Sequence, residues 1–167
     1  EHAQAELLNW SGCGASVMEV SHRSLAFVEV ASQAEATLRR LLGITDDYAV
    51  LFLQGGASLQ FAAVPLNLSA AAQSVDQAVT GQWSKKALQE GQRFGPVNIA
   101  ATSEASNFTT VPPQEAWQLD ADAAYLHYCP NETIGGLEFG FVPQVEVPLV
   151  ADMSSTILSR PIDVQQY

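Results

Sequence analysis

The chain has 167 residues, 47% of them hydrophobic, which is enough to bury one core and is typical of a single domain. Its 18 acidic residues against 7 basic ones give a net charge of −11, which disfavours binding to nucleic acid or to an anionic membrane, because both need clustered Lys and Arg. No apolar run approaches the ~18 residues that a membrane-spanning helix requires.

The first half of the chain predicts two helices, a strand and a further helix. Helix formers fill residues 1–10, and the glycines of "SGCGA" end this segment. Residues 24–42 have apolar residues near helical spacing, and Gly43 follows as a C-cap. The run "YAVLFL" at 48–53 is typical of a strand buried on both faces of a parallel sheet. The turn "QGGASLQ" then leads into a helix that includes Pro65.

The second half repeats the order of strand and helix. We expect a short strand around Ala78, a helix from about Ser84 to Arg93, strands at 97–102 and 123–129 with a helix at 112–119 between them, and a last strand at 147–153. This alternation predicts an α/β fold with a mostly parallel, mixed sheet flanked by helices.

Ligands of such sheets bind where the carboxyl ends of the strands meet. The first of these positions is the Gly-rich turn with Ala57 and Ser58, whose backbone N–H groups suit a phosphate but are equally expected in an ordinary tight turn. The turn matches neither GxGxxG nor GxxxxGK[ST], and Gln60 stands where a GxSxG elbow needs glycine.

Three later strand ends carry the other candidates. Trp83 follows the second predicted strand and is either core filler or a flat face for a planar ligand. Thr133 belongs to a polar group after "YLHYC" that could be only a turn. Asp152 follows the last strand and either caps the next segment or is held ionised against a cationic ligand atom.

Three further groups of residues have side chains of the kind that bind ligands. His22 and Arg23 precede a helix and are either its N-terminal flank or an anion clamp. His127 alternates with apolar residues, as a core histidine does. Three histidines and the distant Cys13 and Cys129 give no metal site and no disulfide framework, and so few cysteines indicate a reducing compartment.

Five blocks, taken together and in order, resemble the phosphoserine aminotransferase family, which belongs to the pyridoxal-phosphate (PLP) enzymes of fold type I, class V. They are "GASVMEVSHRS", "VLFLQGGASLQFAAVPLNL", "TGQWSKKA", "AAYLHYCPNETIGG" and "LVADMSSTILSRPIDV". The resemblance covers essentially the whole chain, and the NETI and ADMSS-to-SRPIDV blocks are its most specific parts.

The resemblance implies a role for each candidate. Ala57 and Ser58 would hold the PLP phosphate, Trp83 would stack on the ring, and Thr133 would lie near the ring hydroxyl. Asp152 would pair with the protonated ring nitrogen, which makes Asp152 and Trp83 the catalytic residues of this chain. His22 and Arg23 would bind the anionic groups of the substrates, phosphoserine, glutamate and 2-oxoglutarate.

The same resemblance implies that residues 1–167 are part of the large, PLP-binding domain of a cytoplasmic homodimer in serine biosynthesis. The family's Schiff-base lysine and small domain have no counterpart here, since Lys85 and Lys86 are the two lysines present and fit a solvated helix face. We therefore expect the chain to be inactive alone. Another class V aminotransferase, or a non-catalytic module with weak affinity for the PLP phosphate, are the alternatives.

Overall fold

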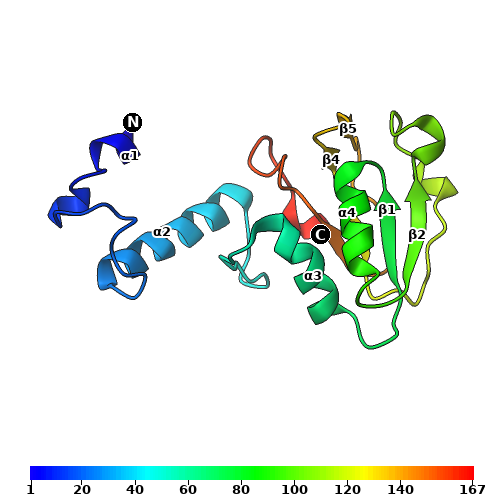
Figure 1. The fold of residues 1–167 in the computed structure, drawn as a ribbon, viewed down its shortest axis with the longest axis horizontal. Coiled ribbons are helices and arrows are strands. Elements are labelled where there is room, and N and C mark those ends of the chain that lie inside the picture. The colour runs from blue at the N-terminus through cyan, green and yellow to red at the C-terminus, as the bar shows by residue number, and fades with distance from the viewer. The chain divides into compact units, whose positions relative to one another are not determined.

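A computed structural model describes all residues from 1 to 167, and these form two compact units, Glu1–Leu51 and Phe52–Tyr167. The first unit contains helices α1 and α2 and a 3-10 turn, η1, drawn in blue to cyan in Figure 1. Their bounds are His2–Ala5 for α1, Trp10–Gly12 for η1 and Leu25–Leu42 for α2.

The sequence predicted α2 correctly, because both of its ends carry clear local signals. The Ser24 hydroxyl accepts a hydrogen bond from the Phe27 N–H at 3.2 Å, which caps the first turn. Gly43 ends the helix in the left-handed conformation, at a φ of 65°. The predicted helix at 1–10 is wrong in length: α1 has four residues and buries none of them, so no packing stabilises a longer helix.

The second unit contains a sheet and the helices that pack on it. Its helices are α3 (Gly56–Leu68) and α4 (Gln82–Gly91), with the 3-10 turns η2 (Glu104–Ser106), η3 (Gln114–Ala116) and η4 (Val164–Gln166). Its strands are β1 (Val75–Val79), β2 (Val97–Thr102), β3 (Leu126–Tyr128), β4 (Asn131–Glu132), β5 (Leu137–Glu138) and β6 (Leu149–Ala151).

Four strands form one parallel sheet in the order β2-β1-β3-β6, and β4 and β5 form a separate antiparallel hairpin. Helix α4 packs on β1 and against α3, as Figure 1 shows. This confirms the predicted α/β fold with a parallel sheet flanked by helices. Because all four strands run in one direction, their carboxyl ends meet at one edge, and the loops that follow them converge there. None of the helices is both long and apolar enough to cross a membrane.

An aromatic cluster fills the space between the sheet and the hairpin. The rings of Tyr128 and Phe139 meet edge to face at 5.2 Å between centroids, and Trp117 meets Phe139 in the same way at 6.3 Å. Small residues of β1 and β2, among them Ala78 and Ala100, belong to the same buried cluster as these rings. The cluster ties the β4–β5 hairpin to the sheet and so fixes the loops at the sheet edge.

The predicted strand at 48–53 is absent. No strand pairs with these residues, and Leu51, Phe52 and Leu53 are 62–70% exposed. An apolar, β-prone run becomes a strand only where a neighbouring strand accepts and donates its backbone hydrogen bonds.

The predicted helix at 112–119 is also wrong, since only the single turn η3 forms there. Pro113 and Trp117 both have extended backbones on either side of this turn. The Gln118 N–H then donates to the Ala100 carbonyl at 2.8 Å, which draws the chain along β2 instead of into a longer helix.

Candidate active site

One pocket of about 310 Å³ lies where the loops after β1, β3 and β6 meet the start of α3. This volume falls in the ~300–1,000 Å³ range of small-molecule sites. All its lining residues belong to the second unit. They are Gly55, Gly56, Ala57, Ser58, Trp83, Asn131, Thr133, Asp152, Ser154 and Ser155.

The first turn of α3 presents unpaired backbone donors to this pocket. Gly55 and Gly56 have φ values of 89° and 58°, a backbone region that favours glycine, and this double turn aims the helix start at the cavity. No side chain caps the helix. The N–H groups of its first turn have no partner within the helix, and they carry the positive end of the helix dipole. The α3 start therefore suits an anion.

Trp83 enters the pocket from the start of α4. It is half-buried, and the Lys86 ammonium lies 4.5 Å from the centroid of its ring. Lys85 lies in the same way over Phe108, at 4.1 Å. Both lysines therefore contact aromatic rings, and neither lines the pocket.

Asp152 supplies a carboxylate from the end of β6. Its backbone N–H donates to the Tyr128 carbonyl at 3.0 Å, which continues the β3–β6 pairing by one residue. Its Oδ1 accepts two hydrogen bonds from Ser154, from the backbone N–H at 3.0 Å and from the hydroxyl at 2.5 Å. Its Oδ2 lies 3.9 Å from the sulfur of Cys129, whose pKa is raised by burial and then by the nearby Glu132 and Asp152. Oδ1 is thus fixed by Ser154, whereas Oδ2 accepts only the long contact from the Cys129 thiol.

Asn131 and Thr133 reach the pocket from the β4–β5 hairpin. The Ser155 hydroxyl donates to Oδ1 of Asn131 at 3.1 Å, which links the hairpin to the segment after Asp152. The pocket thus combines an anion-binding helix start, an aromatic ring, a carboxylate and several hydroxyl and amide groups. Such a set fits a planar ligand that has a phosphate at one end and a cationic atom at the other.

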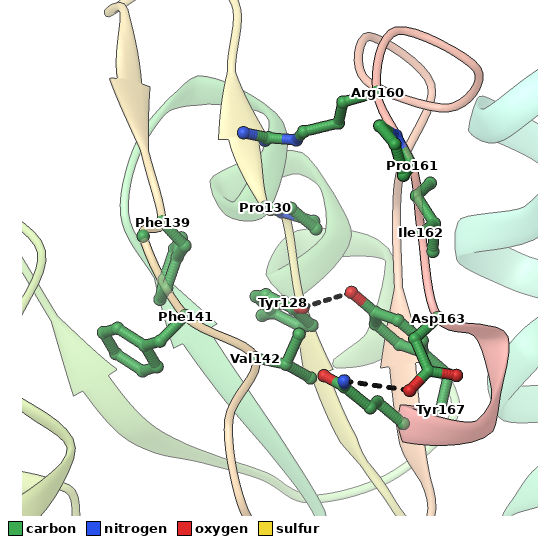
Figure 2. Close-up of a pocket in the computed structure, with 12 residues that line it drawn as sticks. Tyr128, Pro130, Phe139, Phe141, Val142, Arg160, Pro161, Ile162, Asp163 and Tyr167 are labelled. Atoms are coloured by element: carbon green, nitrogen blue, oxygen red, sulfur yellow. Dashed lines mark hydrogen bonds between the residues drawn. The ribbon is translucent and has the colours of Figure 1, made fainter.

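A larger cavity, about 630 Å³, contains none of the predicted site residues (Figure 2). Its charged groups already have partners: Arg160 is paired with Glu138, and Asp163 accepts from the Gln166 amide at 3.1 Å. Figure 2 shows the hydroxyls of Tyr128 and Tyr167 facing each other, 3.4 Å apart. Because its charged groups already have partners, this cavity is the weaker candidate for a ligand site.

The structure brings together five of the seven residues that the sequence singled out: Ala57, Ser58, Trp83, Thr133 and Asp152. Their roles in binding stay predictions. His22 and Arg23 belong to the first unit, where both are exposed and form no ion pair.

No role was predicted from the sequence for three polar residues of the pocket: Asn131, which belongs to the polar group after "YLHYC", and Ser154 and Ser155. The signal was present in the hydroxyl residues that follow Asp152 and in the polar group around Thr133. The structure contains no group of three or more His, Cys, Asp or Glu residues placed to hold a metal.

The chain belongs to the class-V aminotransferase family, because the model of that family matches residues 1–167. Among curated proteins it is 57% identical to the phosphoserine aminotransferase of Ectopseudomonas mendocina and 58% identical to that of Azotobacter vinelandii, in both cases over 100% of this chain and 46% of the relative. The chain thus spans about half the length of these relatives.

Solved structures give the same assignment. The phosphoserine aminotransferase of Bacillus circulans subsp. alkalophilus matches 99% of this chain with a TM-score of 0.94 and 47% identity, over 46% of its own chain. A PLP-bound phosphoserine aminotransferase from Trichomonas vaginalis matches 96% of this chain with a TM-score of 0.89 and 45% identity, also over 46% of its own chain.

Proposed function

We propose that this protein is a phosphoserine aminotransferase that binds PLP and exchanges an amino group between phosphoserine and 2-oxoglutarate, forming 3-phosphohydroxypyruvate and glutamate. Residues 1–167 would be part of its large, cofactor-binding domain. The observation that carries the proposal is that the uncapped start of α3, Trp83 and Asp152 line one pocket. The 57% identity to a phosphoserine aminotransferase supports the choice within the class-V family.

The start of α3 would bind the PLP phosphate. The pocket is lined there by Gly55, Gly56, Ala57 and Ser58 and by no cationic side chain, so backbone N–H groups and the Ser58 hydroxyl would neutralise the phosphate. Anion binding of this kind fixes one end of the cofactor and leaves its ring to the other pocket residues.

Asp152 would hold a proton on the ring nitrogen. PLP, when bound, supplies an electron sink for the carbon from which the substrate proton is removed, and it does so best with a protonated ring. The Ser154 donors hold Oδ1 in place, so Oδ2 would face the nitrogen as an ionised acceptor. The pocket residues thus favour the protonated ring before any substrate arrives.

Trp83 would cover one face of the ring, and Thr133 would bind near the ring hydroxyl, with Asn131 as a second polar neighbour. These contacts orient the ring and exclude water from it. His22 and Arg23 would bind the phosphate or carboxylate of the substrate. The proposed enzyme acts in serine biosynthesis as a cytoplasmic homodimer.

A second candidate function rests on the lysines. Lys85 and Lys86 are the two lysines of these residues, and neither lines the pocket. Because neither lysine lines the pocket, residues 1–167 alone would bind PLP without a covalent bond and without transaminase activity.

Two experiments test these proposals. PLP binding to residues 1–167 is followed by absorbance, and the mixture is then reduced with borohydride for a measurement of the intact mass. We expect binding without a covalent adduct, and a mass increased by one bound PLP would contradict the second candidate function. The enzyme containing these residues is then assayed with phosphoserine and other amino donors, each with 2-oxoglutarate. A preference for another donor would assign it to a different class V reaction.

A further inference from the structure

Glu132 is a fully buried carboxylate that contacts the start of α4. It lies on β4, and both of its oxygens accept hydrogen bonds from backbone N–H groups of the helix. The Trp83 N–H donates to Oε2 at 2.8 Å, and the Ser84 N–H donates to Oε1 at 2.9 Å. These are the second and third positions of α4, whose N–H groups an N-cap side chain ordinarily binds.

The residue at the N-cap position of α4 is Gly81, which has no side chain to serve this purpose. A Cβ atom at Gly81 would lie 2.5 Å from Cδ of Glu132 and 2.6 Å from its Oε2. Its φ of 174° is extended backbone that any residue adopts, so glycine is needed here for space and not for conformation. The carboxylate thus occupies the volume that an N-cap side chain would fill.

Glu132 also stands between two residues of the pocket. Its chain neighbours Asn131 and Thr133 both line the cavity, and Glu132 accepts a hydrogen bond from the N–H of Trp83, which also lines it. A buried carboxylate with two charge-assisted hydrogen bonds is a rigid connection, because breaking either bond leaves a buried charge without its partner. One side chain therefore sets the spacing between Trp83 and the β4–β5 hairpin.

We propose that Glu132 is a positioning residue: it caps α4 from the neighbouring hairpin and thereby fixes Trp83 relative to Asn131 and Thr133. The ligand that Trp83 would bind rests on the proposed function. The contact between Glu132 and the start of α4 does not depend on it. The contact of Glu132 with α4 also distinguishes the two helix starts at this sheet edge. Glu132 occupies the anion site of α4, whereas the start of α3 has no side-chain cap.

The test compares Glu132→Gln with Glu138→Gln in residues 1–167. Glu138 lies on the partner strand of the same hairpin and outside the pocket, so its variant makes the same change of charge without touching α4. PLP and inorganic phosphate are titrated separately. Because the glutamine amide cannot accept both N–H groups, we expect Glu132→Gln to weaken PLP binding by ~10-fold or more. Phosphate binding should change by less than ~2-fold, because the α3 start is untouched.

Amide hydrogen exchange gives a readout that requires no ligand. The Trp83 and Ser84 amides should exchange at least ~10-fold faster in Glu132→Gln and at the original rate in Glu138→Gln. Equal losses of PLP and phosphate affinity would indicate general loosening and overturn the proposal, as would unchanged exchange. Should the original chain bind no PLP, the proposed function fails, and the exchange rates alone decide the role of Glu132.

A second variant covers the case in which Glu132→Gln does not fold. Gly81→Ala keeps the carboxylate but forces it away from α4. It should reproduce the selective loss of PLP affinity and the faster exchange of Trp83 and Ser84. A Gly81→Ala protein with unchanged exchange at both amides would contradict the proposed contact.

Discussion

Gln77 donates a hydrogen bond from its amide nitrogen to Nδ1 of His127, at 2.9 Å, across the β1–β3 pair. Because an amide nitrogen only donates, Nδ1 accepts and carries no proton. The ring also meets Phe61 edge to face at 6.0 Å, and it is buried. His127 is therefore a neutral core histidine, as its apolar neighbours in the sequence predicted.

This environment makes stability depend on pH. Burial lowers the pKa of His127 from 6.5 to about 4, and the nearby Asp152 opposes this shift without reversing it. The unfolded chain then binds a proton more readily than the folded one, so stability is lost as the pH falls from 6.5 towards 4. The loss from this one group is roughly 3 kcal/mol.

Urea unfolding of the original chain and of His127→Gln at several pH values between 4 and 7 measures this effect. The other acids titrate in both proteins, so the difference between the two curves isolates His127. We expect the variant to show the flatter curve. Parallel curves would mean that His127 titrates normally in the folded chain.

Asp152→Asn tests the carboxylate of the pocket. The change keeps the shape of the side chain and removes the charge that would hold the ring nitrogen protonated, so PLP should bind ~10- to 100-fold more weakly. Titration followed by the absorbance of PLP measures the affinity. The matched control is Asp120→Asn. Asp120 accepts a hydrogen bond from the Ser74 hydroxyl just before β1, at the end of the strand away from the pocket. A control that loses as much affinity as Asp152→Asn would assign the effect to net charge alone.

Ser58→Asp tests the anion site at the start of α3. An acidic residue in the first turn favours the helix itself but competes with a phosphate for the same N–H groups, so PLP affinity should fall by at least ~10-fold. Asn67→Asp adds the same charge at the other end of α3, on an exposed residue, and should leave PLP affinity nearly unchanged. Isothermal titration with PLP and with inorganic phosphate compares both variants. Equal affinities in the two variants would place the phosphate elsewhere.

Trp83→Ala and Trp83→Phe separate stacking from general packing. A stacked aromatic pair contributes ~0.5–1.5 kcal/mol, so the alanine variant should lose up to ~10-fold in PLP affinity and the phenylalanine variant much less. Inorganic phosphate should bind equally to all three proteins, since it does not reach the ring. Quenching of Trp83 fluorescence by PLP, measured with Trp10 and Trp117 replaced by Phe, reports the contact directly. Affinities that are the same in both variants would exclude stacking on Trp83.

Local sequence signals predicted the elements whose ends are fixed by local chemistry. Ser24 and Gly43 define α2, and the double glycine marks the start of α3. The strands of the sheet were found from short apolar runs after turns. The predicted strand at 48–53 was wrong because a strand depends on a partner elsewhere in the chain. The local sequence does not reveal whether such a partner lies beside it.

The sequence predicted the part of the candidate site that follows from the order of the strands. Trp83, Thr133 and Asp152 each follow a strand, and a parallel sheet brings such positions to one edge. The role of Glu132, a member of the polar group after "YLHYC", was not predicted, because it depends on a contact with residues 83 and 84, almost 50 positions away in the chain. The space left by Gly81 is likewise visible only once the hairpin and α4 are placed together.

A crystal structure of residues 1–167 with PLP bound would show directly where the cofactor lies. We expect the phosphate at the first turn of α3, the ring nitrogen within about 3 Å of Asp152, and the ring against Trp83. PLP bound instead in the cavity between Tyr128 and Tyr167, or lying with its phosphate at the start of α4 beside Glu132, would contradict the proposed site.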